Sequence, residues 1–362
     1  MEKRKMAIPK MMKALVAYAP KDYRIEEVSV PQLDEGEILI KVEACGICAG
    51  DIKAYNGAPS FWGDSENEPY MKTPVIPGHE FIGTVAMLGT NVKGNFQIGD
   101  RVISEQIVPC WECRFCKTGH YSLCQKNDVY GFKNYLNGGL AEYMKYSKRA
   151  LNYQVQKDIP IEKAILIEPY ACAKHCADRA QIGNNDVVVL SGAGPLGLGI
   201  TGAVKLKKPR ILIVLDIIDE RLQIAKEFGA DIVMNPTKED VVKKIMLITD
   251  GYGCDKYIEA AGNPKSVHQG LAAIRKMGTF VEFSVFKEET SVDWSIIGDR
   301  KELDIYGSHI SPYCYESVIE WIGNGKMPTK GVVTHKYPLE EWKQAFDIAE
   351  KGVGALKVIL TF

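Results

Sequence analysis

The chain has 362 residues, of which 46% are hydrophobic and 25% charged, a composition typical of globular proteins and sufficient for about two domains. Its 45 lysine and arginine residues balance 46 aspartate and glutamate residues, and the net charge of -1 gives no electrostatic basis for binding nucleic acid or an acidic membrane. The apolar run at 187–200 is shorter than the about 20 residues of a membrane-spanning helix.

Residues 1–13 contain basic side chains but lack the apolar core of a signal peptide, so we expect a frayed extension there. Ten cysteines without an export signal indicate a reducing compartment, in which thiols are buried or bind metal. The sequence therefore predicts a cytoplasmic protein.

Two patterns follow one another along the chain. Up to about residue 155, β-branched and alternating runs separated by glycine predict a barrel-like β domain, with strands at 13–18, 24–30, 37–44, 81–88 and 101–108. From about residue 161, apolar strands alternate with helical patterns, which predicts a doubly wound parallel sheet. We expect its strands at 186–192, 211–216, 256–262 and 279–285, and its helices at 195–208, 219–230 and 264–278.

The last part of the chain predicts helices at 315–325 and 339–352 and a strand at 355–362. We expect this part to return to the first domain, which makes the β/α block an insertion. The predicted domains are therefore 1–165 together with 302–362, and 166–301.

Two potential metal ligands, Cys48 and His79, lie in the β-rich part, and a third, Glu168, lies just beyond it. Taken singly, each has an ordinary alternative. Cys45 and Cys48 have the spacing of a redox pair, His79 suits a hydrogen-bonded surface position, and Glu168 suits the first turn of a helix.

A dense cysteine array lies at residues 109–125, where Cys110, Cys113, Cys116 and Cys124 have the spacing C-x2-C-x2-C-x7-C. Four thiolates this close can enclose one tetrahedral zinc ion with no open position. Two disulfides, or thiols that are merely buried, are the alternatives. We predict a structural zinc lobe, which performs no chemistry itself.

A glycine-rich turn follows the apolar strand at 186–191 and reads Gly192-Ala193-Gly194-Pro195-Leu196-Gly197. Its glycines permit a tight turn and close approach of a pyrophosphate to a helix N-terminus. Asp216 ends the next strand, where a carboxylate can accept hydrogen bonds from a ribose, and Ile217 and Ile218 follow it. The turn predicts a dinucleotide site that prefers NAD to NADP, and a glycine-rich turn of another α/β domain is the alternative.

In this order, these motifs resemble the zinc-containing medium-chain alcohol and polyol dehydrogenase family, over about residues 13–362. The similarity includes Gly78-His79-Glu80, the cysteine lobe, the glycine turn and the closing strand, and Glu168-Pro169 with Cys48 resembles the sorbitol, threitol and erythritol branch. The resemblance implies an N-terminal GroES-like catalytic domain, a Rossmann domain that binds NAD, and two zinc ions per chain, one catalytic and one structural.

The resemblance also assigns roles to single residues. It implies a catalytic zinc held by Cys48, His79 and either Glu80 or Glu168, with Asp51 orienting the ring of His79. Two basic residues would contact the cofactor: Lys357 its pyrophosphate and Arg221 its adenosine ribose.

Two positions depart from the family pattern. Gly50 stands where the family has the serine or threonine that takes the substrate proton, and Lys53 stands where a histidine ends that relay. A water molecule in the space beside Gly50, or a glutamate of the zinc site, is expected to replace the usual route.

The function implied is hydride transfer from a secondary hydroxyl of a small polyol to NAD. The long aromatic segment at 55–80 resembles erythritol- and threitol-type members and favours a four-carbon substrate. Within the family, the alternatives are threonine and glucose dehydrogenases, and outside it a non-catalytic zinc-ribbon or nucleotide-sensing protein. We expect a homodimer or homotetramer, by analogy with the family.

Overall fold

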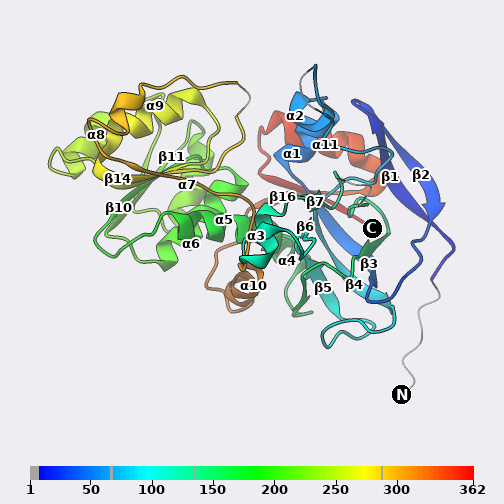
Figure 1. The fold of residues 1–362 in the computed structure, drawn as a ribbon. Helices are drawn as coiled ribbons and strands as arrows, with labels where there is room; N and C mark the ends of the chain where they lie inside the picture. The colour runs from blue at the N-terminus through cyan, green and yellow to red at the C-terminus, as the bar shows by residue number, and fades with distance from the viewer. Residues whose placement is uncertain (1–7, 66–67, 134–135, 287) are drawn as a thin grey trace. The chain divides into compact units, whose positions relative to one another are not determined.

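The computed structural model describes residues 8–65, 68–133, 136–286 and 288–362. The chain forms two compact units: Met1–Glu168 with Thr329–Phe362, and Pro169–Pro328 (Figure 1). Residues 1–7 of the expected N-terminal extension lie outside the described residues. Among the described residues, no helix combines the length and the apolar character that crossing a membrane requires.

Strands dominate the first unit, as predicted. They are β1 (Met11–Ala19), β2 (Asp22–Ser29), β3 (Ile38–Ile47), β4 (Glu80–Leu88), β5 (Arg101–Ser104), β6 (Ile107–Val108), β7 (Asp128–Val129), β8 (Tyr143–Tyr146), β9 (Asn152–Val155), β16 (Val333–Pro338) and β17 (Lys357–Thr361). The main sheet has the order β16-β17-β3-β4-β5-β9, and β8 also pairs with β3. Because β17 pairs with β3, the end of the chain completes this sheet, as the sequence predicts.

Short helices accompany these strands. They are α1 (Ala49–Tyr55), α2 (Pro59–Trp62), α3 (Arg114–Lys117), η1 (Tyr121–Leu123), α4 (Ile161–Ala164), η3 (Leu339–Glu341) and α11 (Trp342–Lys351). Both faces of β3 and β4 are largely buried, which explains why these strands are almost continuously apolar. The longest helix of this group, α11, packs its buried residues Trp342, Ala345 and Phe346 into the same core.

The second unit is a parallel sheet with helices on both faces (Figure 1). Its strands are β10 (Val187–Ser191), β11 (Ile211–Leu215), β12 (Ile232–Met234), β13 (Cys254–Glu259), β14 (Ile274–Glu282) and β15 (Asp304–Gly307), in the order β12-β11-β10-β13-β14-β15. Its helices are α6 (Pro195–Leu206), α7 (Asp219–Glu227), α8 (Val241–Ile248), α9 (Pro264–Ala273), η2 (Trp294–Ile296) and α10 (Tyr315–Gly323), while α5 (Ile167–Arg179) begins just before the unit. From β10 the chain adds β11 and β12 on one side, and then returns to add β13, β14 and β15 on the other side. Ligands of doubly wound sheets bind where the order of the strands reverses in this way.

Two segments differ from the sequence prediction. The helix expected at 264–278 ends at Ala273, and β14 begins at Ile274, which pairs with Cys254 of β13. Pairing with a neighbouring strand therefore overrides the local helical pattern. Residues 302–328, which the sequence analysis grouped with the first domain, have their contacts in the second unit. The reason is that β15 extends the parallel sheet beside β14.

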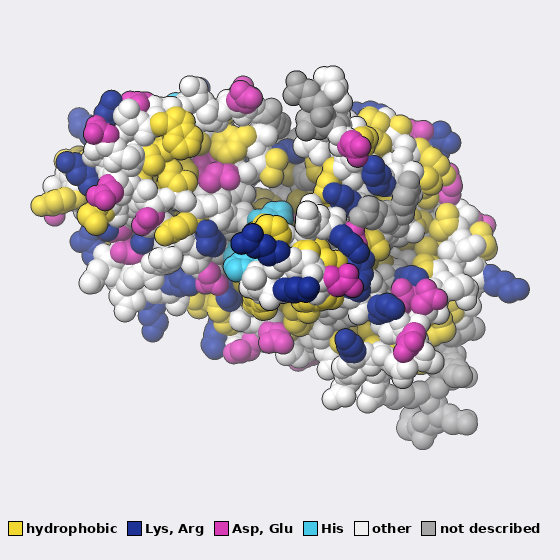
Figure 2. Space-filling model, viewed as in Figure 1, with side chains coloured by type: hydrophobic (Ala, Val, Ile, Leu, Met, Phe, Trp, Pro, Cys, Tyr) yellow, Lys and Arg dark blue, Asp and Glu magenta, His cyan; other side chains and the backbone are white. Residues whose placement is uncertain are grey.

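Charged side chains of both signs share the surface. On the face shown in Figure 2, lysine and arginine side chains lie among aspartate and glutamate side chains. This mixture agrees with the net charge of -1.

Candidate metal centres and dinucleotide site

The four cysteines of the lobe come together in the first unit. The Sγ atoms of Cys110 and Cys116 lie 3.9 Å apart and those of Cys113 and Cys116 lie 3.6 Å apart, and all four sulfurs lie within 4.8 Å of one another. A tetrahedral zinc ion with Zn–S bonds of about 2.3 Å separates its sulfurs by about 3.8 Å. A disulfide needs about 2.05 Å, and all four cysteines are free thiols, so the disulfide alternative does not fit. The donor set is suited to a closed zinc site.

Backbone N–H groups stabilise the thiolate form of Cys110 and Cys113, whereas burial raises the pKa of Cys116 to about 12. The N–H groups of Glu112 and Cys113 point to Cys110 Sγ at 3.4 and 3.3 Å, and that of Gln125 points to Cys113 Sγ at 3.5 Å. The N–H groups of Gln125 and Cys116 lower the pKa of Cys113 to about 6. Because zinc binds thiolates rather than thiols, the surroundings of Cys110 and Cys113 favour metal binding, while Cys116 would lose its proton when the metal binds.

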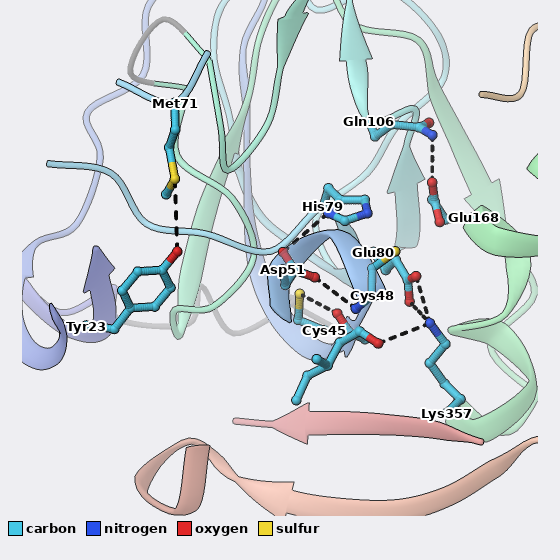
Figure 3. A network of polar contacts seen from close by, with 12 residues as sticks. Tyr23, Cys45, Cys48, Asp51, Met71, His79, Glu80, Gln106, Glu168 and Lys357 are labelled. Carbon is cyan, nitrogen blue, oxygen red and sulfur yellow. Dashed lines mark hydrogen bonds and ion pairs between the residues drawn. The ribbon is translucent and has the colours of Figure 1, made fainter. Parts of the chain in front are cut away.

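The second candidate centre lies where β3 ends and β4 begins. Gly46 pairs with Glu80 across these antiparallel strands, which brings Cys48, at the N-terminus of α1, beside His79. The ligand atoms of Cys48, His79 and Glu80 lie within 4.8 Å of one another (Figure 3). A thiolate, an imidazole and a carboxylate are the donors that zinc accepts at a catalytic site with one open position.

Asp51 is buried beside both Cys48 and His79. It is 1% exposed, its Oδ2 accepts a hydrogen bond of 2.9 Å from the N–H of Cys48, and its Oδ1 lies 3.5 Å from Nδ1 of His79. Burial lowers the pKa of His79, but Asp51 and Cys48 outweigh burial and raise this pKa well above its ordinary value. The surroundings of the His79 ring therefore favour a positive charge, which a divalent cation would supply. Because Nδ1 faces Asp51, Nε2 is the ring nitrogen that remains to bind the cation.

Lys357 is buried, and its ammonium group is paired within the first unit. It is 4% exposed, and its Nζ donates to both carboxylate oxygens of Glu80 at 2.7 Å and to the carbonyl of Ile47 at 3.3 Å (Figure 3). In this structure the charge of Lys357 compensates a buried carboxylate, which would otherwise be strongly destabilised, and the contact with the cofactor stays a prediction.

Glu168 lies outside the set formed by Cys48, His79 and Glu80. Its Oε1 accepts a hydrogen bond of 2.6 Å from Nε2 of Gln106, and both side chains are buried. Gln106 is not among the site residues predicted from the sequence. A signal was present, since Glu105 and Gln106 are adjacent polar residues directly before the apolar pair Ile107–Val108.

Gly50 and Lys53 both lie on α1. A Cβ atom added to Gly50 would lie 4.0 Å from Cys48 Sγ, 4.0 Å from Cε1 of His79 and 3.8 Å from Cζ of Phe61, which are ordinary contact distances. The space that a side chain would fill therefore borders the ligand set. Lys53 lies one turn further along the helix and is half-buried.

The glycine turn has the geometry that close approach of a phosphate needs. Gly192 has φ +106, and a Cβ atom added to it would lie 2.6 Å from the carbonyl oxygen of Ala260. A Cβ atom added to Gly197 would lie 2.0 Å from the carbonyl oxygen of Gly192. Both positions thus exclude any side chain. Gly194 has nothing within 4 Å of the same position, which leaves its surroundings open. Pro195 then starts α6, with Gly194 as N-cap, and Leu196 is half-buried.

Asp216 lies directly beside this turn. Its Oδ2 accepts a hydrogen bond of 2.7 Å from the N–H of Ala193, its Oδ1 accepts one of 2.9 Å from Ile218, and it is 9% exposed. Ile217 is 64% exposed, and Arg221 is half-buried on α7. A carboxylate therefore occupies the end of β11, next to the N-terminus of α6, and its contact with a ribose stays a prediction.

Comparison with known proteins agrees with this geometry. Residues 34–160 match the alcohol dehydrogenase GroES-like domain, and residues 195–324 match the zinc-binding dehydrogenase family. The chain is 46% identical over 355 residues to erythritol/L-threitol dehydrogenase of Mycolicibacterium smegmatis, covering 98% of both chains. It is 32% identical to sorbitol dehydrogenase of Bacillus subtilis, covering 94% of both.

A solved structure from E. coli, described as a short chain alcohol dehydrogenase complexed with NADH, has a TM-score of 0.86 and 28% identity, covering 98% of this chain and 100% of its own. Sequence similarity over nearly the whole chain, the two matched domains and the two clustered donor sets agree. The chain belongs to the zinc-containing, NAD-dependent medium-chain alcohol and polyol dehydrogenases.

Proposed function

We propose that this enzyme oxidises a secondary hydroxyl of a four-carbon polyol of the erythritol or threitol type and transfers the hydride to NAD. The observation that carries the proposal is the cluster of Cys48, His79 and Glu80 in a chain that is 46% identical to an erythritol/L-threitol dehydrogenase along its whole length. The ring of Phe132 lies beside His79, and Phe61 from the long segment between Cys48 and His79 packs against Phe132; such aromatic surfaces suit the C–H faces of a small polyol.

The three clustered side chains are our proposed protein ligands of the catalytic zinc, with Glu80 as the carboxylate. Glu168, held by Gln106, is then the neighbouring acid rather than a direct ligand. A zinc ion bound there acts as a Lewis acid that lowers the pKa of an alcohol hydroxyl. The chain itself orients the donors: Asp51 fixes the ring of His79, and Lys357 balances the charge of Glu80.

The proton of the substrate hydroxyl needs an acceptor, because Gly50 carries no hydroxyl group. We propose that a water molecule or a second hydroxyl of the polyol occupies the space beside Gly50, where the contact distances leave room for about one heavy atom. A polyol has a neighbouring hydroxyl to place there and a monohydric alcohol has none.

We propose NAD as the natural acceptor, because the buried carboxylate of Asp216 would repel the additional phosphate of NADP and the exposed Ile217 offers it no cation. Gly192, Gly194, Pro195, Leu196 and Gly197 would then form the pyrophosphate turn, with Arg221 near the ribose. The proposal also includes two zinc ions per chain, a homodimer or homotetramer, and a cytoplasmic location, which the pattern of free cysteines supports.

Steady-state kinetics with purified enzyme test the proposal. Zinc content is measured by mass spectrometry, and NADH formation is followed with erythritol, both threitol enantiomers, xylitol, sorbitol, 2-butanol, L-threonine and glucose. We expect two zinc ions per chain and the highest kcat/KM with a four-carbon polyol and NAD. Preference for L-threonine or glucose would establish one of the alternatives within the family, and one zinc ion with no turnover would contradict the proposal.

A further inference from the structure

Three aromatic side chains pack together beside the proposed ligand set in the first unit, with Phe132 against His79; we call Phe61, Tyr70 and Phe132 the aromatic wall. The ring of Phe132 lies 5.2 Å from that of His79 and 5.1 Å from that of Phe61, and Tyr70 lies 6.2 Å from Phe61 and 6.5 Å from Phe132. These centroid distances are those of packed aromatic rings, so the three form one continuous surface.

Backbone and side-chain hydrogen bonds fix the wall in place. The carbonyl of Phe61 accepts from the N–H of Met71 at 2.8 Å, and that of Phe132 accepts from Lys72 at 3.0 Å. The indole N–H of Trp62 donates to the carbonyl of Ala54 at 2.6 Å, which ties α2 to α1. The wall is therefore pre-organised relative to the helix that carries Gly50.

Phe61 closes the space that Gly50 leaves open. A Cβ on Gly50 would be in van der Waals contact with Phe61 Cζ at 3.8 Å and with Cys48 Sγ and His79 Cε1 at 4.0 Å. This position thus accepts one heavy atom, such as a hydroxyl oxygen, in contact with both the Phe61 ring and the ligand set.

We propose that Phe61 and Gly50 together limit the length of the polyol that this enzyme accepts, an inference that rests on the proposed function. Gly50 leaves room for one hydroxyl beside the metal ligands, and Phe61 prevents a longer chain from extending past it. Phe61 is therefore a specificity-determining residue for the four-carbon substrate.

The experiment compares kcat/KM for erythritol and xylitol in the parent enzyme, Phe61→Ala, Gly50→Ala and the double variant. Phe61→Ala should shift the ratio toward xylitol by roughly 10-fold or more, because a pocket contact of this size is worth about one to two orders of magnitude. Gly50→Ala fills the gap and should lower kcat/KM for erythritol. In the double variant, the added methyl group occupies part of the space that Phe61→Ala opens. The shift of the ratio toward xylitol should therefore be smaller than in Phe61→Ala alone. Since the two side-chain sites touch, their effects should not be additive.

Trp62→Phe is the matched control, because it removes the hydrogen bond to Ala54 and loosens the same helix without enlarging the gap. It should keep the parent ratio. An equal shift in Trp62→Phe, or an unchanged ratio in a Phe61→Ala protein with parental unfolding temperature and zinc content, would overturn the inference.

Calorimetric titration of the same proteins with the two polyols separates this inference from the proposed function. If the parent enzyme turns over no polyol, the proposed function fails, whereas the binding ratio still decides the role of Phe61. Weaker discrimination between the polyols in Phe61→Ala supports the inference, and identical discrimination in parent and variant contradicts it.

Discussion

The buried ion pair between Lys357 and Glu80 allows a prediction with a defined magnitude. The ammonium lies 2.7 Å from both carboxylate oxygens, and the two side chains are 5% and 2% exposed. At an effective dielectric constant of about 20, this separation corresponds to an attraction of about 6 kcal/mol, which the cost of burying both charges partly offsets. Removing one member of such a pair leaves the other buried and unpaired, and typically costs about 3–5 kcal/mol.

We therefore expect Lys357→Met to lower the free energy of unfolding by about 3–5 kcal/mol in urea titrations of the metal-depleted protein. Adding Glu80→Gln should restore much of this loss, because the remaining amide carries no charge. With zinc bound the loss should be smaller, since the cation compensates Glu80 in place of the ammonium.

The alternative role, contact with the cofactor pyrophosphate, makes the opposite prediction. It requires Lys357→Met to raise KM for NAD while stability stays within about 1 kcal/mol of the parent. That result, together with no recovery in the double variant, would refute the structural role of Lys357.

Three further predictions concern other sites. Cys113→Ser should lose one zinc ion per chain and unfold at lower temperature, while the folded fraction keeps some turnover; a well-folded but fully inactive variant would contradict a purely structural lobe. Asp216→Ser with Ile217→Arg should shift kcat/KM from NAD toward NADP, and equal use of both cofactors by the parent would contradict the role of Asp216. Burial raises the pKa of Glu105 from about 4.5 to about 7, although two tyrosine hydroxyls oppose the shift. The folded protein thus retains this proton longer than the unfolded chain, and stability should fall by about 3 kcal/mol as the pH rises from 4.5 to 7. Glu105→Gln should remove this part of the pH dependence, and an unchanged unfolding profile would show that Glu105 does not cause it.

The parts of the site that the sequence predicted are those formed by nearby residues. The cysteine array and the glycine turn each lie within a short segment, so the identity and spacing of their residues nearly determine the geometry. The same holds for Asp51, which is three residues from Cys48 and caps the helix that Cys48 begins.

The remaining parts depend on contacts between distant segments. The partner of Lys357, Glu80, is 277 residues away, and the two meet because β17 and β4 both pair with β3. Gln106 and Glu168 are 62 residues apart, and the end of α9 depends on pairing with β13 rather than on local helical preference. Such features require the three-dimensional arrangement, because neither partner carries a local signal for the other.

Glu105 and Gln106 form the short connection between β5 and β6, and their side chains belong to different hydrogen-bond networks. Glu105 accepts hydrogen bonds from the hydroxyls of Tyr121, within the cysteine lobe, and Tyr153, while Gln106 donates to Glu168. Tyr121 lies between Cys116 and Cys124, so two hydrogen bonds and one peptide unit join the cysteine lobe to Glu168. A change in the lobe that moves Tyr121 would therefore alter the surroundings of both Glu105 and the neighbouring Gln106–Glu168 pair.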